Sequence, residues 1–169
     1  MSEMSYTTLD NFFRELAQKH VDINDYCGTS AEELAQKITS VNGVVSPILV
    51  FFNYSGKLYG TQQRTFNNRL VSFAIMFTGI KTDEFPEQRT AVNAAERIGL
   101  EILARINIQS KMPNIGWLYN NFDKELVTYD EIENEGEDEY YGMEFHFQLK
   151  NHEPLTVDKT KWSDGDIFC

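Results

Sequence analysis

Carboxylates dominate one short stretch of the chain, residues 130–139, which reads DEIENEGEDE. Such a density of acids could coordinate a cation, contact a basic partner or supply acid–base groups. A calcium loop with Gly136 at its sixth position needs a bidentate Glu at its twelfth, where this chain has Gly142. The spacing therefore favours an exposed, solvated loop over a metal site. The candidate interface residues of this loop are Glu131, Glu133, Glu135, Glu137, Asp138 and Glu139.

The other reactive side chains form no recognisable site in the sequence. Zinc sites need Cys and His ligands at short spacing, whereas Cys27 has no second cysteine nearby and His146 and His152 are isolated from other ligands. The chain contains no GxSxG, P-loop or GxGxxG motif. We therefore expect no catalytic residue, no metal and no cofactor, and keep a small enzyme with an unrecognised site as a third hypothesis.

Charge and composition limit the classes of function. The chain has 169 residues, 41% of them hydrophobic, and 26 acids against 15 bases give a net charge of −11. Binding along a phosphate backbone needs clustered Lys and Arg, and the longest basic candidate is KTK at 159–161. We expect no nucleic-acid-binding module, no membrane span and no secretion signal. Cys27 and Cys169 are then expected to be free thiols in a reducing cytoplasm, with a bridge between them as the alternative.

Apolar residues at one-turn spacing predict three helices. The first covers residues 7–20, the second residues 30–41, and the third and longest residues 82–109. Ser30 and Glu33 form a capping box at the start of the second helix. Small residues in the third helix would let its backbone approach a sheet closely, namely Ala94, Ala95 and Gly99.

Runs of apolar residues, continuous or alternating with polar ones, predict the strands. A continuous apolar run at 48–52 indicates a strand covered on both faces, and SGK at 55–57 is expected to be a turn. Strands at 71–78 and 141–149 alternate cleanly, which puts His146 on the polar face of the last strand. One or two short strands of undetermined register are expected between Trp117 and Ile132.

The order of these elements predicts an α+β fold. Consecutive strands without intervening helices favour antiparallel pairing, so we expect an antiparallel sheet packed against one long helix, with the N-terminal helices at its edge. Residues 1–150 would form this single domain, and residues 151–169 an arm docked on its own domain or on a neighbouring subunit. The large apolar residues of the arm are candidates for a subunit contact, namely Trp162, Ile167 and Phe168.

Several segments, taken in their order along the chain, resemble a family of bacteriophage proteins. SPILVFFNYSGKLYG and RLVSFAIMF precede a long helix that ends in LEILARI, and DEYYGMEFHFQL and KTKW follow it. This layout resembles the neck and tail-completion proteins of tailed bacteriophages, the tail-terminator-like group of head–tail connector proteins, over about residues 45–165. The resemblance rests on the element order and the closing strand rather than on a diagnostic motif.

The resemblance implies a structural virion protein with no catalytic residues. Members form homo-oligomeric rings around a central DNA channel and join the portal or connector to the tail, after assembly in the cytoplasm of the bacterial host. The partners would be copies of the chain and neighbouring neck, portal or tail proteins, with DNA only as passing cargo. Residues 133–139 would then line the channel or an interface and repel phosphates. The alternative is a soluble cytosolic binding or immunity-type protein whose acidic loop engages a basic protein partner.

Overall fold

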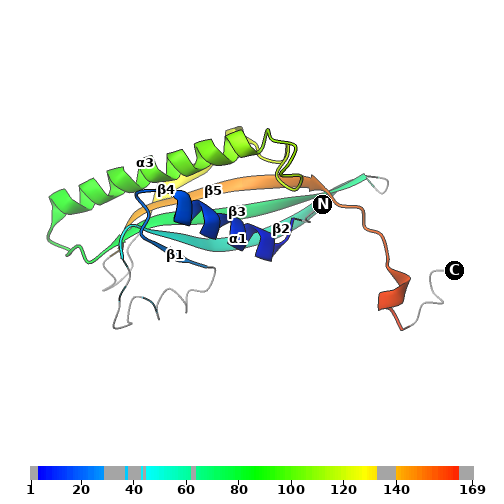
Figure 1. Cartoon of the computed structure of the whole chain (residues 1–169), viewed down its shortest axis with the longest axis horizontal. Helices are drawn as coiled ribbons and strands as arrows, with labels where there is room; N and C mark the ends of the chain where they lie inside the picture. The colour runs from blue at the N-terminus through cyan, green and yellow to red at the C-terminus, as the bar shows by residue number, and fades with distance from the viewer. Residues whose placement is uncertain are drawn as a thin grey trace.

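A computed structural model describes residues 4–28, 37, 43, 45–61, 64–132 and 140–163 of the chain. They form an α+β fold in which two described helices pack against one sheet (Figure 1). No helix among these residues is long and apolar enough to cross a membrane. The described elements, in chain order, are α1 (Tyr6–Lys19), β1 (Asp25–Cys27), β2 (Ile48–Thr61), β3 (Arg64–Thr78), α3 (Phe85–Gln109), η1 (Lys124–Leu126), β4 (Thr128–Glu131), β5 (Tyr140–His152) and η2 (Lys159–Lys161).

The sheet has the strand order β1-β2-β3-β5-β4. Every pair but one is antiparallel, and the long helix α3 packs against the sheet, so the predicted α+β class is confirmed. The exception is β1, which pairs parallel with the start of β2 and makes the sheet mixed. The sequence predicts a polar connection here, because a strand of three residues is too short to show alternation. The hydrogen bonds of β1 form only when the folded chain places this segment beside β2.

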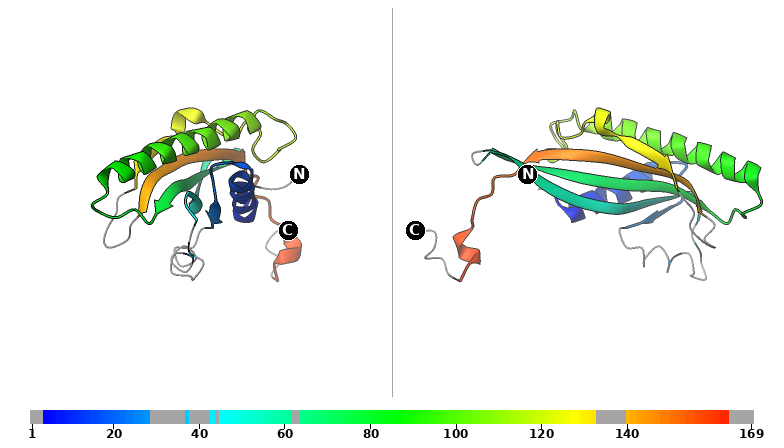
Figure 2. Two further views of the ribbon diagram at one scale, coloured as in Figure 1. Left: turned by 60° about the vertical axis from the view of Figure 1, so that its left-hand side comes forward. Right: turned by 180° about the vertical axis from the view of Figure 1, so that it is seen from behind.

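The β2–β3 hairpin is longer than the sequence predicts. A turn is expected at 55–57, but Ser55 and Lys57 continue β2 and pair with Leu70 and Asn68 of β3. That prediction is wrong because β3 offers a partner at each of these positions. Ladder hydrogen bonds and cross-strand side-chain contacts outweigh the turn preference of a single glycine. The far half of the hairpin consequently projects beyond both helices (Figures 1 and 2).

Stacked aromatic rings form the centre of the core on one face of the sheet. Phe73 of β3 stacks on its cross-strand partner Phe145 of β5, with ring centroids 5.0 Å apart. Phe13 of α1 stacks on Phe51 of β2 at 5.0 Å and lies 5.3 Å from Phe73. All four side chains are fully buried. These contacts hold α1 over the β1–β2 side of the sheet, in agreement with the predicted position of the N-terminal helix.

Helix α3 approaches this aromatic layer most closely at Gly99. A side-chain carbon added to Gly99 would lie 2.0 to 2.8 Å from three carbon atoms of the Phe145 ring. Carbon atoms in contact are normally about 3.5–4.0 Å apart, so the ring occupies the space that any side chain at this position would need. The close approach that the small residues of this helix predict is therefore confirmed at Gly99.

The opposite face of the sheet carries a smaller apolar cluster beside β1. Its buried members include Cys27, Ile48 and Ala74. The predicted helix at 30–41 lies outside the described residues except for Lys37. Its capping box is outside them as well, and so is Cys169.

The contact between Gly99 and Phe145 generates a prediction about stability. Alanine is favoured over glycine by about 1 kcal/mol in a helix interior, so a Gly99→Ala change without a clash would stabilise the protein. Overpacking a core typically costs about 1–3 kcal/mol, and here it involves a ring stacked on both sides. We expect Gly99→Ala to lower the free energy of unfolding by about 1–2 kcal/mol, measured by urea denaturation followed by circular dichroism.

A double mutant separates this clash from other effects of the Gly99→Ala substitution. Phe145→Leu leaves more room beneath Gly99, so Gly99→Ala should cost less in that background than in the wild type. An equal cost in both backgrounds would show that the Phe145 ring does not limit this position.

Candidate functional site

The described part of the acidic segment lies at the end of the sheet where α3 begins. Glu131 is the last residue of β4 and is exposed. Asp130 pairs with Glu144 of β5, so two carboxylates lie directly opposite each other across the two strands. Like charges in such positions repel, which suits an exposed edge rather than a folded core. The remaining candidate acids of the loop, Glu133, Glu135, Glu137, Asp138 and Glu139, lie outside the described residues.

The pairing of β3 with β5 creates a row of polar side chains that resembles a catalytic relay. Ser72 pairs with His146, and the Ser72 hydroxyl lies 2.7 Å from Nδ1 of that ring. On the other side of the ring, His146 Nε2 lies 3.2 Å from Glu144 Oε1. A hydroxyl, an imidazole and a carboxylate in this order are the groups of a serine hydrolase.

Burial argues that this row is structural. A nucleophile must reach a substrate, but Ser72 is completely buried in the sheet. A buried hydroxyl requires a hydrogen-bond partner, and His146 supplies it from the neighbouring strand. The row therefore satisfies the hydroxyl, while the carboxylate of Glu144 remains partly exposed.

Three metal-ligand side chains approach each other where α1 ends. The ligand atoms of His20, Asp22 and Glu101 all lie within 4.8 Å of one another. The Asp22 N–H donates to His20 Nδ1 at 3.2 Å, which leaves the ring proton on Nε2, and Nε2 lies 3.0 Å from Glu101 Oε2. Arg97 lies 3.4 Å from Asp22 and 3.9 Å from Glu101 and supplies the positive charge between them. The group is thus an ion-pair network that fastens the end of α1 to α3.

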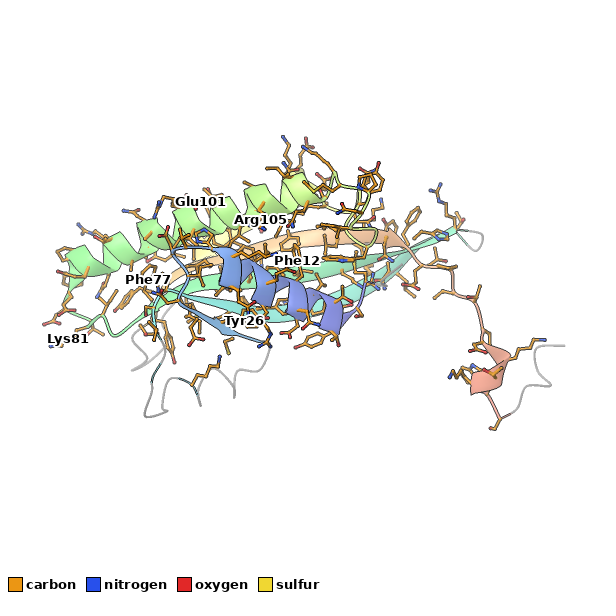
Figure 3. All side chains as sticks on the ribbon, in the orientation of Figure 1. Phe12, Tyr26, Phe77, Lys81, Glu101 and Arg105 are labelled. Atoms are coloured by element: carbon orange, nitrogen blue, oxygen red, sulfur yellow. The ribbon has the colours of Figure 1, made fainter. Side chains whose placement is uncertain are left out.

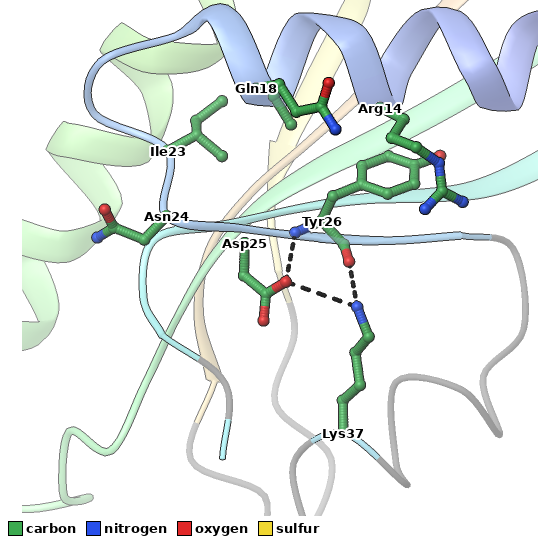
Figure 4. Close-up of a pocket in the computed structure, with 8 residues that line it drawn as sticks. Arg14, Gln18, Ile23, Asn24, Asp25, Tyr26 and Lys37 are labelled. Carbon is green, nitrogen blue, oxygen red and sulfur yellow. Dashed lines mark hydrogen bonds and ion pairs between the residues drawn. The ribbon is translucent and has the colours of Figure 1, made fainter. Parts of the chain in front are cut away.

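A hollow of about 290 Å³ lies between α1 and β1 (Figure 4). Arg14 reaches in from α1 with its guanidinium 4.9 Å from the Tyr26 ring, and Lys37 donates to the Tyr26 backbone carbonyl. Both cations already face carboxylates, Asp10 at 3.3 Å and Asp25 at 3.5 Å. Burial, reinforced by a hydrogen bond to Asp10, raises the pKa of the Tyr26 hydroxyl far above its usual value. The charges in the hollow are therefore matched, and the contacts join β1 to α1.

The buried side chain of Arg69 holds the start of the C-terminal arm. Its Nε donates to the Tyr54 hydroxyl at 2.9 Å, its Nη1 donates to Asn151, and its Nη2 lies 3.4 Å from Glu153 Oε2. The Glu153 N–H also donates to the Thr65 carbonyl at 2.9 Å. These bonds hold the chain against β3 as far as Glu153. The folded domain therefore extends beyond residue 150, where its end was predicted.

Beyond this anchor the arm runs away from the sheet and exposes its apolar side chains (Figures 1 and 2). Leu155 is 65% exposed, Val157 49% and Trp162 56%. Trp162 follows η2, whose start is capped by the side chain of Asp158. The structure thus places one predicted contact residue, Trp162, on an exposed arm. The other two, Ile167 and Phe168, lie outside the described residues.

Neither comparison with known proteins identifies a relative. No protein-family model matches the chain, and no curated protein matches it significantly. The geometry of the described residues therefore has to carry the functional inference.

Neither the Arg69 anchor nor the pairing of Ser72 with His146 is predicted from the sequence. Alternation within each strand already places Ser72 and His146 on polar faces. Only the register of β3 against β5 puts them opposite each other. Arg69 directly precedes the apolar run of β3, and a charged residue beside such a run is the signal that could have indicated a buried ionic contact.

Glu144 generates a prediction about pH. Partial burial raises the pKa of its carboxyl above the usual 4.5, Asp130 adds to the rise, and His146 opposes it. The folded protein then binds this proton more tightly than the unfolded chain. The resulting stabilisation is complete below pH 4.5 and is lost as the pH rises through the folded pKa. Glu144→Gln should therefore make the free energy of unfolding depend less on pH as the pH rises above 4.5.

The measurement is urea denaturation at a series of pH values, with Glu125→Gln as the control at an exposed carboxylate. A Glu144→Gln profile parallel to that of the wild type would contradict the assigned rise in pKa.

Proposed function

We propose that the protein is a structural subunit that assembles with copies of itself into a ring in the neck or tail of a tailed bacteriophage. The ring would join the portal or connector to the tail around the DNA channel. The observation that carries this proposal is the C-terminal arm, which is anchored at its root by Arg69 and exposes large apolar side chains beyond it. An arm of this kind supports a role in contacts between subunits.

The energetics of the arm favour a protein contact. Burying a Val or Leu side chain contributes roughly 1.5–3 kcal/mol, and tryptophan is among the residues that dominate binding energy at interfaces. Three such side chains within eight residues are a large apolar surface for a segment with so little structure of its own. Covering Leu155, Val157 and Trp162 with a neighbouring subunit would remove this surface from water.

The shape of the molecule supports the same proposal. The hairpin tip and the arm project from one end of the sheet, because β5 leads into the arm where it pairs with the outer part of β3 (Figure 1). Projecting segments at one end can reach an adjacent copy without disturbing the core. The net charge of −11 suits a ring that DNA passes through without binding.

The proposal predicts that the arm is needed for assembly and not for folding. Changing Leu155, Val157 and Trp162 to Ser should abolish concentration-dependent oligomers in sedimentation velocity. The free energy of unfolding should change by less than about 0.5 kcal/mol, because exposed positions contribute little to stability.

The matched control changes three exposed apolar residues outside the arm, Val21, Leu100 and Ile108, to Ser. This control should assemble like the wild type. A wild-type protein that remains monomeric at all concentrations and forms a 1:1 complex with a basic protein would instead favour the binding or immunity-type function.

A further inference from the structure

Cations and aromatic rings gather on the outer half of the hairpin. We name this group the hairpin patch and define it as Lys57, Tyr59, Arg64, Phe66 and Lys150. The rings of Tyr59 and Phe66 stack with centroids 5.5 Å apart. Lys150 Nζ lies 5.0 Å from the Tyr59 ring centre and 5.3 Å from that of Phe66, and the Arg64 guanidinium lies 4.9 Å from Phe66. Cation–π contacts of this kind hold charged groups in place while leaving them accessible.

A hollow of about 390 Å³ adjoins the patch and gives it depth. Its floor includes Asn68 and Gln148, whose side-chain amides hydrogen-bond at 2.7 Å across β3 and β5. Leu126 and Asp123, next to the edge of β5, form part of its rim. The hollow therefore offers amide, apolar and cationic groups together on one surface.

The patch lies on the face of the sheet opposite the helices. Successive side chains of a strand point to opposite faces of the sheet. Asn68 is five residues before Phe73 in β3, an odd number, so the two side chains point to opposite faces. Lys150 pairs with Asn68 and therefore lies on the same face as Asn68. Phe73 belongs to the aromatic layer beneath the helices, so Asn68 and Lys150 point to the other side. The arm begins directly after this part of β5. Patch and arm consequently share one end of the molecule.

The opposite end of the same sheet is acidic. Asp130, Glu131 and Glu144 lie there. Glu131 pairs with Met143, seven residues before Lys150 on β5, which is roughly 23 Å of strand at 3.3 Å per residue. This exceeds the Debye length of about 8 Å at physiological salt. The acids at this end of a chain therefore do not neutralise the patch of the same chain.

We propose that the hairpin patch binds the acidic end of a second copy of this chain. This inference rests on the proposed ring and names the surfaces through which its subunits meet. Because the two surfaces differ and lie at opposite ends, the contact is head-to-tail, the type of interface that closes rings or builds filaments. Opposite charge on the two surfaces guides the encounter and sets its orientation.

Charge complementarity favours a second copy over nucleic acid as the occupant. The patch is a small cationic area on a chain with 26 acids and 15 bases. A polyanion lying on the patch would extend past it toward the carboxylate of Asp123. The acidic end of another copy is compact and matches the few cations of the patch.

Charge reversal on each surface tests the proposal by sedimentation velocity. We expect the patch variant Lys57→Glu with Lys150→Glu, and the acidic-end variant Asp130→Lys with Glu131→Lys, each to weaken self-association roughly tenfold or more. Raising the salt from about 50 to about 500 mM should weaken the wild type in the same direction. Arg105→Glu with Lys111→Glu, at exposed cations on and just after α3, is the matched control and should assemble normally.

Mixing the two charge-reversed variants is the decisive step. Each variant keeps one intact surface, and the two reversed surfaces are again opposite in charge, so the mixture should associate at concentrations where neither variant associates alone. An unfolded variant could not give this rescue. A patch variant that assembles like the wild type, or a mixture that stays monomeric, would overturn the proposed interface.

Two further outcomes separate this inference from the proposed function. If the wild type assembles and both charge variants do so equally well, the interface is wrong while a ring built through the arm still stands. If the wild type never assembles, the proposed function fails as well. Tight binding of a fluorescent single-stranded DNA of about 20 nucleotides, lost in the patch variant, would assign the patch to nucleic acid and overturn the proposal.

Discussion

The contact of Gly99 with the Phe145 ring places α3 on the aromatic layer that positions both described helices on the sheet. Because glycine adds no side chain, α3 rests directly on a ring that is stacked on Phe73. Phe73 in turn contacts Phe13, so the same aromatic layer positions α1. Both described helices are therefore held on one face of the sheet. The outer hairpin extends past them, and its patch is left on the uncovered side.

The sequence predicts the local elements well and the long-range pairing poorly. The one-turn spacing of 82–109 and the alternation of 141–149 predict α3 and β5 because both patterns reflect burial within a single element. The turn expected at 55–57 is wrong and the short strand β1 is missed, because each depends on a partner strand distant in sequence. The approach of Ser72 to His146 and the anchoring of Glu153 by Arg69 depend on register in the same way. A pattern of residue types carries no information about that register.

The polar groups of the described residues are of two kinds, those matched within the chain and those presented outward. The carboxylates around His20 are matched by Arg97, and the cations beside Tyr26 are matched by Asp10 and Asp25. In contrast, the hairpin patch, the acidic end and the arm present charge or apolar surface outward. The hairpin patch and the arm lie at one end of the sheet, and the acidic residues lie at the other. Repeated head-to-tail contact requires two different surfaces placed in this way. This arrangement supports the proposed assembly.

Cross-linking between isotopically distinct copies tests the central claim most directly. Protein labelled with heavy nitrogen is mixed with unlabelled protein and treated with a lysine-reactive cross-linker, and the linked peptides are identified by mass spectrometry. Lys159 and Lys161 report on the arm, and Lys81 reports on the end where α3 begins (Figure 3). If the hairpin patch of one copy binds the acidic end of the next, the arm beside the patch comes close to that end, and links from Lys159 or Lys161 to Lys81 will join heavy and light peptides. Links from the arm that join only peptides of one isotope, at concentrations where the protein associates, would contradict this assembly.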